Sequence, residues 1–372
     1  MACSCSAAKR VKVFVFLSAG LGAARWQKAW SSGTLAGLCE PLPYGYFHAA
    51  SDLWTITYSE DRDENAPTEL FRKILRKILG FDLIHAWHNR GGLLDSHIVW
   101  THTEREYLAV LSLWKLLRPR TRPRLIAQSI WLFDRWKSFS PLRRWFYRRL
   151  ISGADLMTAL SPDNVSAARR LFPEKRCELV RFGIPADFLR PVSKKQFHRP
   201  IRILSPGTDM HRDWKTLVEA VRDWSEGQLI IANRTLRKPR SWPTNVSIIR
   251  PATAQDVVNL YSWADVVVVP LKPNLHASGI TVIVEAVLFG VPVICTDTGG
   301  LRAYFDEAEV GYVKRNAFQA IRDKILEFAA DDERRLTLIN CAQQRVLRDQ
   351  LTSYGYAIRH RELSEAIFSM QS

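Results

Sequence analysis

The chain has 372 residues, of which 47% are hydrophobic and 24% are charged, so it holds enough apolar material for two buried cores and is not a generally disordered protein. It carries a net charge of +16, and its isoelectric point is near 9.8. That charge favours an anionic partner, which leaves nucleic acid, an anionic membrane surface and phosphorylated substrates as candidates.

The aromatic, apolar and cysteine residues indicate where in the cell the protein is expected. The 13 tryptophans beside many arginines favour a membrane interface. The longest early apolar stretch, 11–24, is shorter than the ~20 residues of a spanning helix. The six cysteines lack paired metal-site spacing apart from Cys3-Ser-Cys5, which favours reduced thiols. We expect a cytoplasmic protein that lies peripherally on the inner face of the membrane.

The first half of the chain alternates apolar runs with helical stretches. Residues 11–17 form a continuous β-branched and aromatic run, typical of a strand buried on both faces, and a glycine-bearing turn, 18–22, follows it. Further predicted strands cover 54–58, 83–87, 125–130, 155–160 and 177–181, and predicted helices cover 69–78, 104–117 and 162–171. This alternation predicts a mainly parallel sheet.

The alternation restarts after a polar linker at 191–200. Predicted strands cover 201–204, 228–232, 246–249, 265–270 and 292–296, and predicted helices cover 214–224, 254–264 and 281–289. From residue 316 the pattern is helical. We therefore expect one domain at 1–190, a second domain at 200–353 and a final helix at 354–372 that packs back on the first domain.

The segment 271–301 is the densest functional signal. A predicted strand there opens into a polar loop that runs into a helix, an arrangement that presents backbone N–H groups and the positive end of the helix dipole to an anion. Ser278, Gly279, Ile280 and Thr281 form the expected cradle for a diphosphate. Glu285 follows about one turn into the helix, where its carboxylate can accept hydrogen bonds from ribose hydroxyls; an ordinary solvated helix glutamate is the alternative.

This region resembles the C-terminal signature of the family 4 glycosyltransferases. The matching pieces are Ala264-Asp-Val-Val-Val-Val-Pro270, Glu285-Ala286, Gly290-Val-Pro-Val-Ile294 and Thr298-Gly-Gly300. The resemblance implies an α/β protein of the GT-B fold, with two Rossmann-like doubly wound domains facing a cleft. It implies that the domain at 1–190 binds the acceptor and that the domain at 200–353 binds the nucleotide-sugar. It also implies a retaining enzyme in which Glu285 holds the nucleotide ribose.

One position departs from the family pattern. The family usually has an earlier glutamate eight positions before the second, and Ala277 stands there. His276, Ser278 and Asn274 are the candidates to replace its hydrogen bonds to the donor sugar, and we place His276 among the catalytic residues. A change of sugar specificity or a weaker activity is expected from this departure.

A second match begins at Pro206-Gly207 and runs to Lys215. The family places a basic side chain here against the donor diphosphate, and Arg212 is the nearest equivalent, followed by Lys215. An exposed capping segment with Asp213 as the N-cap is the alternative. Gly207 and Arg234 are further donor-site candidates, because Arg234 follows a predicted strand.

The acceptor side is matched more loosely. Gly22, after the first strand, gives room for the donor phosphate or the acceptor. The family often has a histidine after the strand at 125–130, and here Trp131, Asp134 and His102 are candidates for its role. The turn 43–46 either stacks on sugar faces or forms a surface turn.

Basic residues gather in the first half of the chain. The helix at 69–78 carries Arg72, Lys73, Arg76 and Lys77, and further arginines cover 118–124 and 143–149. The same helix has an apolar stripe, so it either packs inside the domain or docks on anionic lipid.

Together with these patterns, the resemblance implies a retaining, metal-independent hexosyltransferase that moves a sugar from a nucleotide-sugar substrate to a lipid-linked glycan acceptor in surface polysaccharide or glycolipid biosynthesis. No cofactor and no metal site is expected, since no Asp-x-Asp motif lies near the site. The alternatives are a GT-B nucleotide-sugar epimerase and a non-enzymatic, basic nucleic-acid-binding protein, although no nucleic-acid module is visible.

Overall fold

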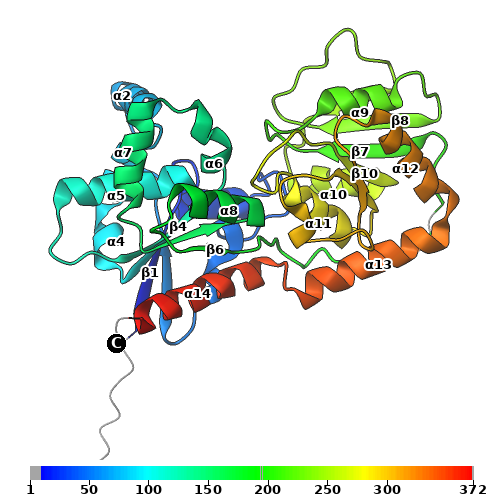
Figure 1. Ribbon diagram of the computed structural model, residues 1–372. Coiled ribbons are helices and arrows are strands. Elements are labelled where there is room, and N and C mark those ends of the chain that lie inside the picture. The colour runs from blue at the N-terminus through cyan, green and yellow to red at the C-terminus, as the bar shows by residue number, and fades with distance from the viewer. Residues whose placement is uncertain (1–9, 193, 195, 371–372) are drawn as a thin grey trace, which may run out of the picture.

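The computed structural model describes residues 10–192, 194 and 196–370. Its two sheets form separate lobes (Figure 1). Cys3, Cys5 and the outermost residues of the expected domain boundaries lie outside this range. None of the helices within it combines the length and apolar character that crossing a bilayer requires.

The first sheet has six parallel strands in the order β2-β1-β3-β4-β5-β6. Its strands are β1 Val11–Phe16, β2 Trp54–Tyr58, β3 Ile98–Thr101, β4 Arg124–Ser129, β5 Leu156–Ala159 and β6 Cys177–Leu179. The helices of this lobe are α1 Ala23–Ser31, α2 Ala66–Leu79, α3 Leu83–His88, α4 Arg90–Asp95, α5 Glu104–Leu117, α6 Leu132–Arg135, α7 Pro141–Ile151 and α8 Pro162–Leu171, with 3-10 turns η1 Pro43–Ala49 and η2 Trp136–Ser138.

The second sheet is also parallel, in the order β12-β11-β10-β7-β8-β9. Its strands are β7 Ile201–Pro206, β8 Gly227–Ala232, β9 Val246–Ile249, β10 Val266–Val269, β11 Val293–Thr296 and β12 Gly311–Val313. The helices are α9 Trp214–Val221, α10 Ala254–Trp263, α11 Ile280–Leu288, α12 Phe318–Ala330, α13 Asp332–Arg348 and α14 Ser353–Ser369, with the 3-10 turn η3 Leu301–Ala303. Two such sheets flanked by helices are the predicted GT-B fold.

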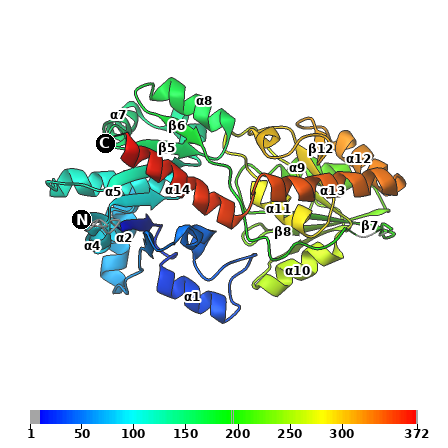
Figure 2. The same cartoon turned by 90° about the horizontal axis from the view of Figure 1, so that it is seen from below.

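The last two helices connect the lobes. In both views α13 follows the second lobe and α14 crosses to the first (Figures 1 and 2). Trp100 Nε1 donates a hydrogen bond of 2.9 Å to Ser364 Oγ, and the hydroxyls of Tyr46 and Tyr356 lie 2.9 Å apart. All four residues are buried, so α14 belongs to the core of the first lobe.

One strand prediction in the first half was wrong. Residues 83–87 form helix α3 rather than a strand, because Asp82 Oδ1 accepts a hydrogen bond of 3.0 Å from the backbone N–H of His85 and caps the helix. The strand at this place in the sheet is β3, whose four residues are all buried. Because β3 has only four residues, the sequence contains no run at this place that is long enough to predict a strand.

Helix α2 does not pack its apolar stripe inside the domain. None of its residues is buried, and Leu70, Phe71, Ile74 and Ile78 are 59%, 61%, 51% and 63% exposed. The helix is tied to α7 at its end, where Tyr147 Oη donates a hydrogen bond of 2.8 Å to the carbonyl of Leu79. The stripe is therefore an exposed apolar surface.

Candidate functional site

A cavity of about 480 Å³ is lined by residues of both lobes. The first lobe contributes Tyr44, His102 and Trp131, and the second contributes Gly207 and Arg234 among others. Most of these residues directly follow a strand of their sheet. Ligands of parallel α/β sheets bind at this carboxyl edge, so the cavity lies where the two Rossmann-like domains present their binding edges to each other.

Arg212 lies against the backbone at the second-lobe side of this cavity. A Cβ on Gly207 would approach Arg212 Nε to 2.4 Å, and a Cβ on Gly279 would approach Nη1 to 2.6 Å. Both glycines also have positive φ, +135° and +88°. The two glycines therefore make the space that the guanidinium occupies.

The guanidinium of Arg212 is buried without a protein counterpart. The residue is 4% exposed, and Nε and Nη1 form no hydrogen bond with any described residue. Burial lowers the pKa of Arg212 to about 10, so the side chain still carries its charge near neutral pH. A buried, charged group with free donors on the wall of a cavity is a site for an anion.

Glu285 lies on helix α11 and lines the same cavity. Its Oε2 accepts a hydrogen bond of 2.6 Å from Tyr261 Oη, and the Tyr261 ring stacks on Phe289 at 5.0 Å. Burial raises the pKa of Glu285 to about 7, against the opposing effects of Tyr261 and Arg212. Tyr261 was missed at the sequence level, because its distance of 24 residues from Glu285 in α10 gives no local pattern.

The loop before α11 separates the predicted donor residues into two groups. Gly279, Ile280 and Thr281 line the cavity, and no side chain caps the start of the helix. Asn274 and Ser278 are buried behind them, where Asn274 Oδ1 accepts a hydrogen bond of 3.1 Å from the Ser278 N–H. These two residues shape the loop rather than line the cavity.

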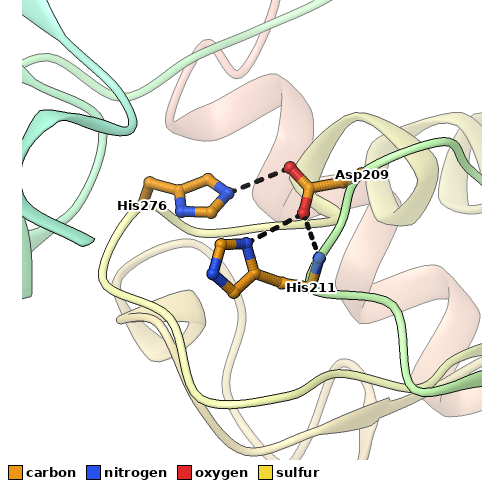
Figure 3. A group of neighbouring side chains, drawn as sticks. All are labelled: Asp209, His211 and His276. Carbon is orange, nitrogen blue, oxygen red and sulfur yellow. Dashed lines mark hydrogen bonds and ion pairs between the residues drawn. The ribbon is translucent and has the colours of Figure 1, made fainter. Parts of the chain in front are cut away.

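His276, predicted as catalytic, also lies behind the cavity wall. Its Nδ1 is 2.8 Å from Asp134 Oδ2 of the first lobe. Its Nε2 is 3.2 Å from Asp209 Oδ2 of the second lobe, a contact drawn in Figure 3. Burial alone would lower the pKa of His276, but the two carboxylates raise it to about 9. The charged imidazolium thus joins the two lobes, and the structure places it there instead of on the cavity surface.

Asp209 is the second carboxylate of this group and does line the cavity. Its oxygens are 3.1 Å from His211 Nδ1 and accept a hydrogen bond of 3.3 Å from Trp131 Nε1 across the lobes. Burial would raise the pKa of Asp209, but the hydrogen bond with His276 and its other partners hold it well below the usual range.

Asp209, His211 and His276 have possible metal-ligand atoms within 4.8 Å of one another. Both ring nitrogens of His276 already face carboxylate oxygens. Nδ1 faces Asp134, and Nε2 faces Asp209, as Figure 3 shows for the second contact. The proximity of the three residues is accounted for by ion pairs, because each ring nitrogen of His276 has a carboxylate partner.

Two of the three predicted acceptor residues, His102 and Trp131, line the cavity. His102 stacks on Tyr44 at 3.6 Å, and its Nδ1 is 3.1 Å from Tyr46 Oη. Burial, with a further effect of His360, lowers the pKa of His102 to about 3, so its imidazole is neutral near pH 7.

Two predicted residues lie away from the cavity lining. Lys215 is exposed on α9, whose N-cap is Asp213, as the capping alternative proposed. Gly22 packs against Asp61, because a Cβ on it would come within 2.4 Å of the Asp61 nitrogen. The space at Gly22 is thus filled by the chain itself.

Part of the chain is similar to a known protein family. Residues 234–345 match the family model of the glycosyl transferases group 1. A D-inositol 3-phosphate glycosyltransferase of Corynebacterium urealyticum is 32% identical over 104 residues, which are 28% of this chain and 24% of that protein.

Solved structures are similar over nearly the whole chain. A sucrose-phosphate synthase of Thermosynechococcus elongatus gives a TM-score of 0.69 at 17% identity and covers 96% of this chain and 100% of its own. Anabaena HepE in complex with UDP-glucose gives 0.65 at 14% identity, with 95% and 99% covered. At such identities the likeness concerns the fold. Residues 234–345 are thus similar to the glycosyl transferases group 1, within a chain that has the two-domain GT-B fold.

Proposed function

We propose that this protein is a retaining glycosyltransferase that uses a nucleotide-sugar donor. The observation that carries the proposal is the buried Arg212 guanidinium, whose Nε and Nη1 lack any partner among the described residues and which shares a cavity with Glu285. A cation and a hydrogen-bond acceptor in one cavity suit the diphosphate and the ribose of a nucleotide, respectively.

The diphosphate is bound by Arg212 and by the start of α11. Thr281 and Val282 belong to the first turn of this helix, which has no side-chain cap, and both line the cavity. Free N–H groups and the positive end of the helix dipole attract the phosphate oxygens. The same groups stabilise the charge that develops as the bond from the sugar to the diphosphate breaks, so the proposed mechanism requires no metal ion.

The acceptor approaches from the first lobe, past Tyr44, His102 and Trp131. We propose a lipid-linked glycan acceptor in surface polysaccharide or glycolipid biosynthesis, delivered by docking on the inner face of the membrane. The support is the exposed apolar stripe of α2, together with the basic residues that α2 and α7 carry. A charged and apolar surface of this kind matches an anionic lipid surface.

The test is a thermal-shift screen with UDP-, GDP- and ADP-sugars, followed by product analysis with the sugar that stabilises the protein. We expect one base to raise the melting temperature of the wild type, and Glu285→Gln to reduce that shift. Transfer to an acceptor with an unchanged anomeric configuration supports the proposal. A free epimerised sugar, or the absence of any nucleotide effect, contradicts it.

A further inference from the structure

A second hollow, of about 210 Å³, lies in the first lobe at the loop that follows β1. Its wall includes Ala19 and Gly20 of this loop and four arginines, Arg25, Arg62, Arg72 and Arg76. A smaller hollow of about 50 Å³ shares Ala19 and Arg76 with it and adds Arg105. The donor cavity contains none of these residues.

Most of these arginines are unpaired. Arg72 is held by Glu64 at 2.7 Å and Asp82 at 2.6 Å. By contrast, no described residue forms an ion pair or a side-chain hydrogen bond with the other four arginines of the two hollows, which are Arg25, Arg62, Arg76 and Arg105.

The carboxylates in the wall are already engaged. Asp61 accepts hydrogen bonds from the backbone N–H groups of Gly20 and Gly22, at 2.8 and 3.3 Å, and Glu64 holds Arg72. Three free guanidinium groups, those of Arg25, Arg62 and Arg76, line the larger hollow, and that of Arg105 lines the adjoining smaller one. These groups repel each other and concentrate positive potential there. An anion that several arginines can contact at once relieves this repulsion, and phosphate oxygens suit the guanidinium fork.

Glu106 lines the smaller hollow and links it to the donor cavity. Its carboxylate accepts hydrogen bonds from the N–H groups of Ser18 at 3.0 Å and of His102, a residue of the donor cavity, at 2.6 Å. Helix α2 carries Arg76 into the hollow and exposes Ile74 and Ile78 to solvent. A lipid whose chain lies along α2 would bring its head group to these arginines.

We propose that these two adjoining hollows bind the phosphate or diphosphate group of the lipid-linked acceptor, through Arg25, Arg62 and Arg76 of the larger hollow and Arg105 of the smaller one. The inference rests on the proposed glycosyltransferase function and names a separate site for the second substrate. It also gives the basic residues of the first lobe a specific role in addition to general attraction to the membrane.

The experiment titrates the full-length protein with geranyl diphosphate, inorganic diphosphate and geraniol by calorimetry. We expect Arg25→Gln/Arg62→Gln to weaken geranyl diphosphate binding at least tenfold, as expected for lost charge-assisted hydrogen bonds. Arg170→Gln, an exposed arginine of α8 outside both hollows, is the matched control and keeps wild-type affinity. Geraniol, which lacks the anion, is expected not to bind.

Titration with the nucleoside diphosphate separates this inference from the proposed function. The double variant is expected to keep the wild-type affinity for the nucleotide, and Arg212→Gln to lose it while binding geranyl diphosphate normally. The inference is overturned if the folded double variant binds geranyl diphosphate as tightly as the wild type, or if only inorganic diphosphate depends on these arginines. Absence of nucleotide binding, with geranyl diphosphate binding intact, counts against the proposed function alone.

Discussion

At the scale of single residues, the account depends on a charge that the protein leaves unpaired. Arg212 is buried between Gly207 and Gly279 with two free donor nitrogens, an arrangement that costs stability in the absence of a ligand. A residue kept in this state is better explained by ligand binding than by folding. Stability and activity should therefore respond in opposite directions when the charge is removed.

Arg212→Met keeps much of the length of the side chain and removes its charge. We expect kcat/KM to fall by about 10²–10³, as for the loss of one preorganised donor to a leaving group, and the free energy of unfolding to stay equal or to rise. Steady-state kinetics and urea unfolding measure the two effects. Lys215→Gln, in the same segment but exposed on α9, should change neither; a comparable loss in both variants would contradict the assignment.

The contact between the lobes through His276 predicts a dependence of stability on pH. The pKa of His276 is raised to about 9 in the folded protein, so its contribution is complete below about pH 6.5 and is lost as the pH rises through 9. The pKa of Asp209 is lowered, so its contribution is present above about pH 4 and is lost in acid.

The test compares the melting temperatures of the wild type and His276→Gln from pH 5 to 10. Asp134, Asp209 and His211 are the titratable groups that face this imidazole. We expect a destabilisation on the order of 1–3 kcal/mol at pH 6 that shrinks toward pH 10. A difference that stays constant over this range would mean that His276 is neutral.

At the scale of elements, periodic burial patterns gave the most accurate predictions. Strands β2 and β9 and helices α5 and α8 have the predicted bounds. Burial alternates along the two edge strands, and the helices bury one face, so both impose a clear period on the sequence. The strand predicted at 83–87 failed because a five-residue apolar run fits either a strand or a helix, and the Asp82 cap decided for the helix.

Helix α2 shows a second limit of prediction from sequence. Its amphipathic pattern did not reveal whether protein or another surface covers the apolar side.

Replacing Phe71 and Ile78 by Ser should change the free energy of unfolding by no more than about 0.5 kcal/mol relative to the wild type, since both side chains are mostly exposed. The same variant should bind vesicles that contain phosphatidylglycerol more weakly than the wild type. Co-sedimentation at low and high salt measures the binding.

Leu347→Ser is the matched control for this surface, because Leu347 is 51% exposed on α13 of the second lobe. It should bind the vesicles as the wild type does. Neutral phosphatidylcholine vesicles should bind every variant weakly, and salt should weaken the binding to anionic vesicles. Equal binding to neutral and anionic vesicles would remove the docking proposal.

At the scale of the whole molecule, the alternation of strands and helices predicted two parallel sheets, but not the contacts between distant segments. The pairing of His276 with Asp134 spans 142 residues, and that of Tyr356 with Tyr46 spans 310. No spacing in the sequence indicates such pairs. Most of the donor residues predicted after β7 and β10 line the cavity, whereas His276 and Lys215, predicted as catalytic, lie outside its lining.

Tyr356 tests how strongly α14 joins the lobes. Its hydroxyl donates a hydrogen bond of 2.7 Å to Gln128 Oε1 and lies 2.9 Å from Tyr46 Oη, in a fully buried cluster. Tyr356→Phe leaves these partners unsatisfied, so we expect a loss of about 1–3 kcal/mol in urea unfolding. Tyr354→Phe, at a half-exposed position of the same helix, should have no measurable effect, and equal stability of both variants would contradict this role.

The central claim is that one cavity binds the diphosphate at Arg212 and the nucleoside at Glu285. Calorimetric titration of Arg212→Gln and Glu285→Gln with the preferred nucleoside and with its diphosphate tests this division directly. We predict that Glu285→Gln weakens the binding of both ligands, whereas Arg212→Gln weakens that of the diphosphate alone. Equal losses for both ligands in Arg212→Gln, or unchanged nucleoside affinity in Glu285→Gln, would contradict the account.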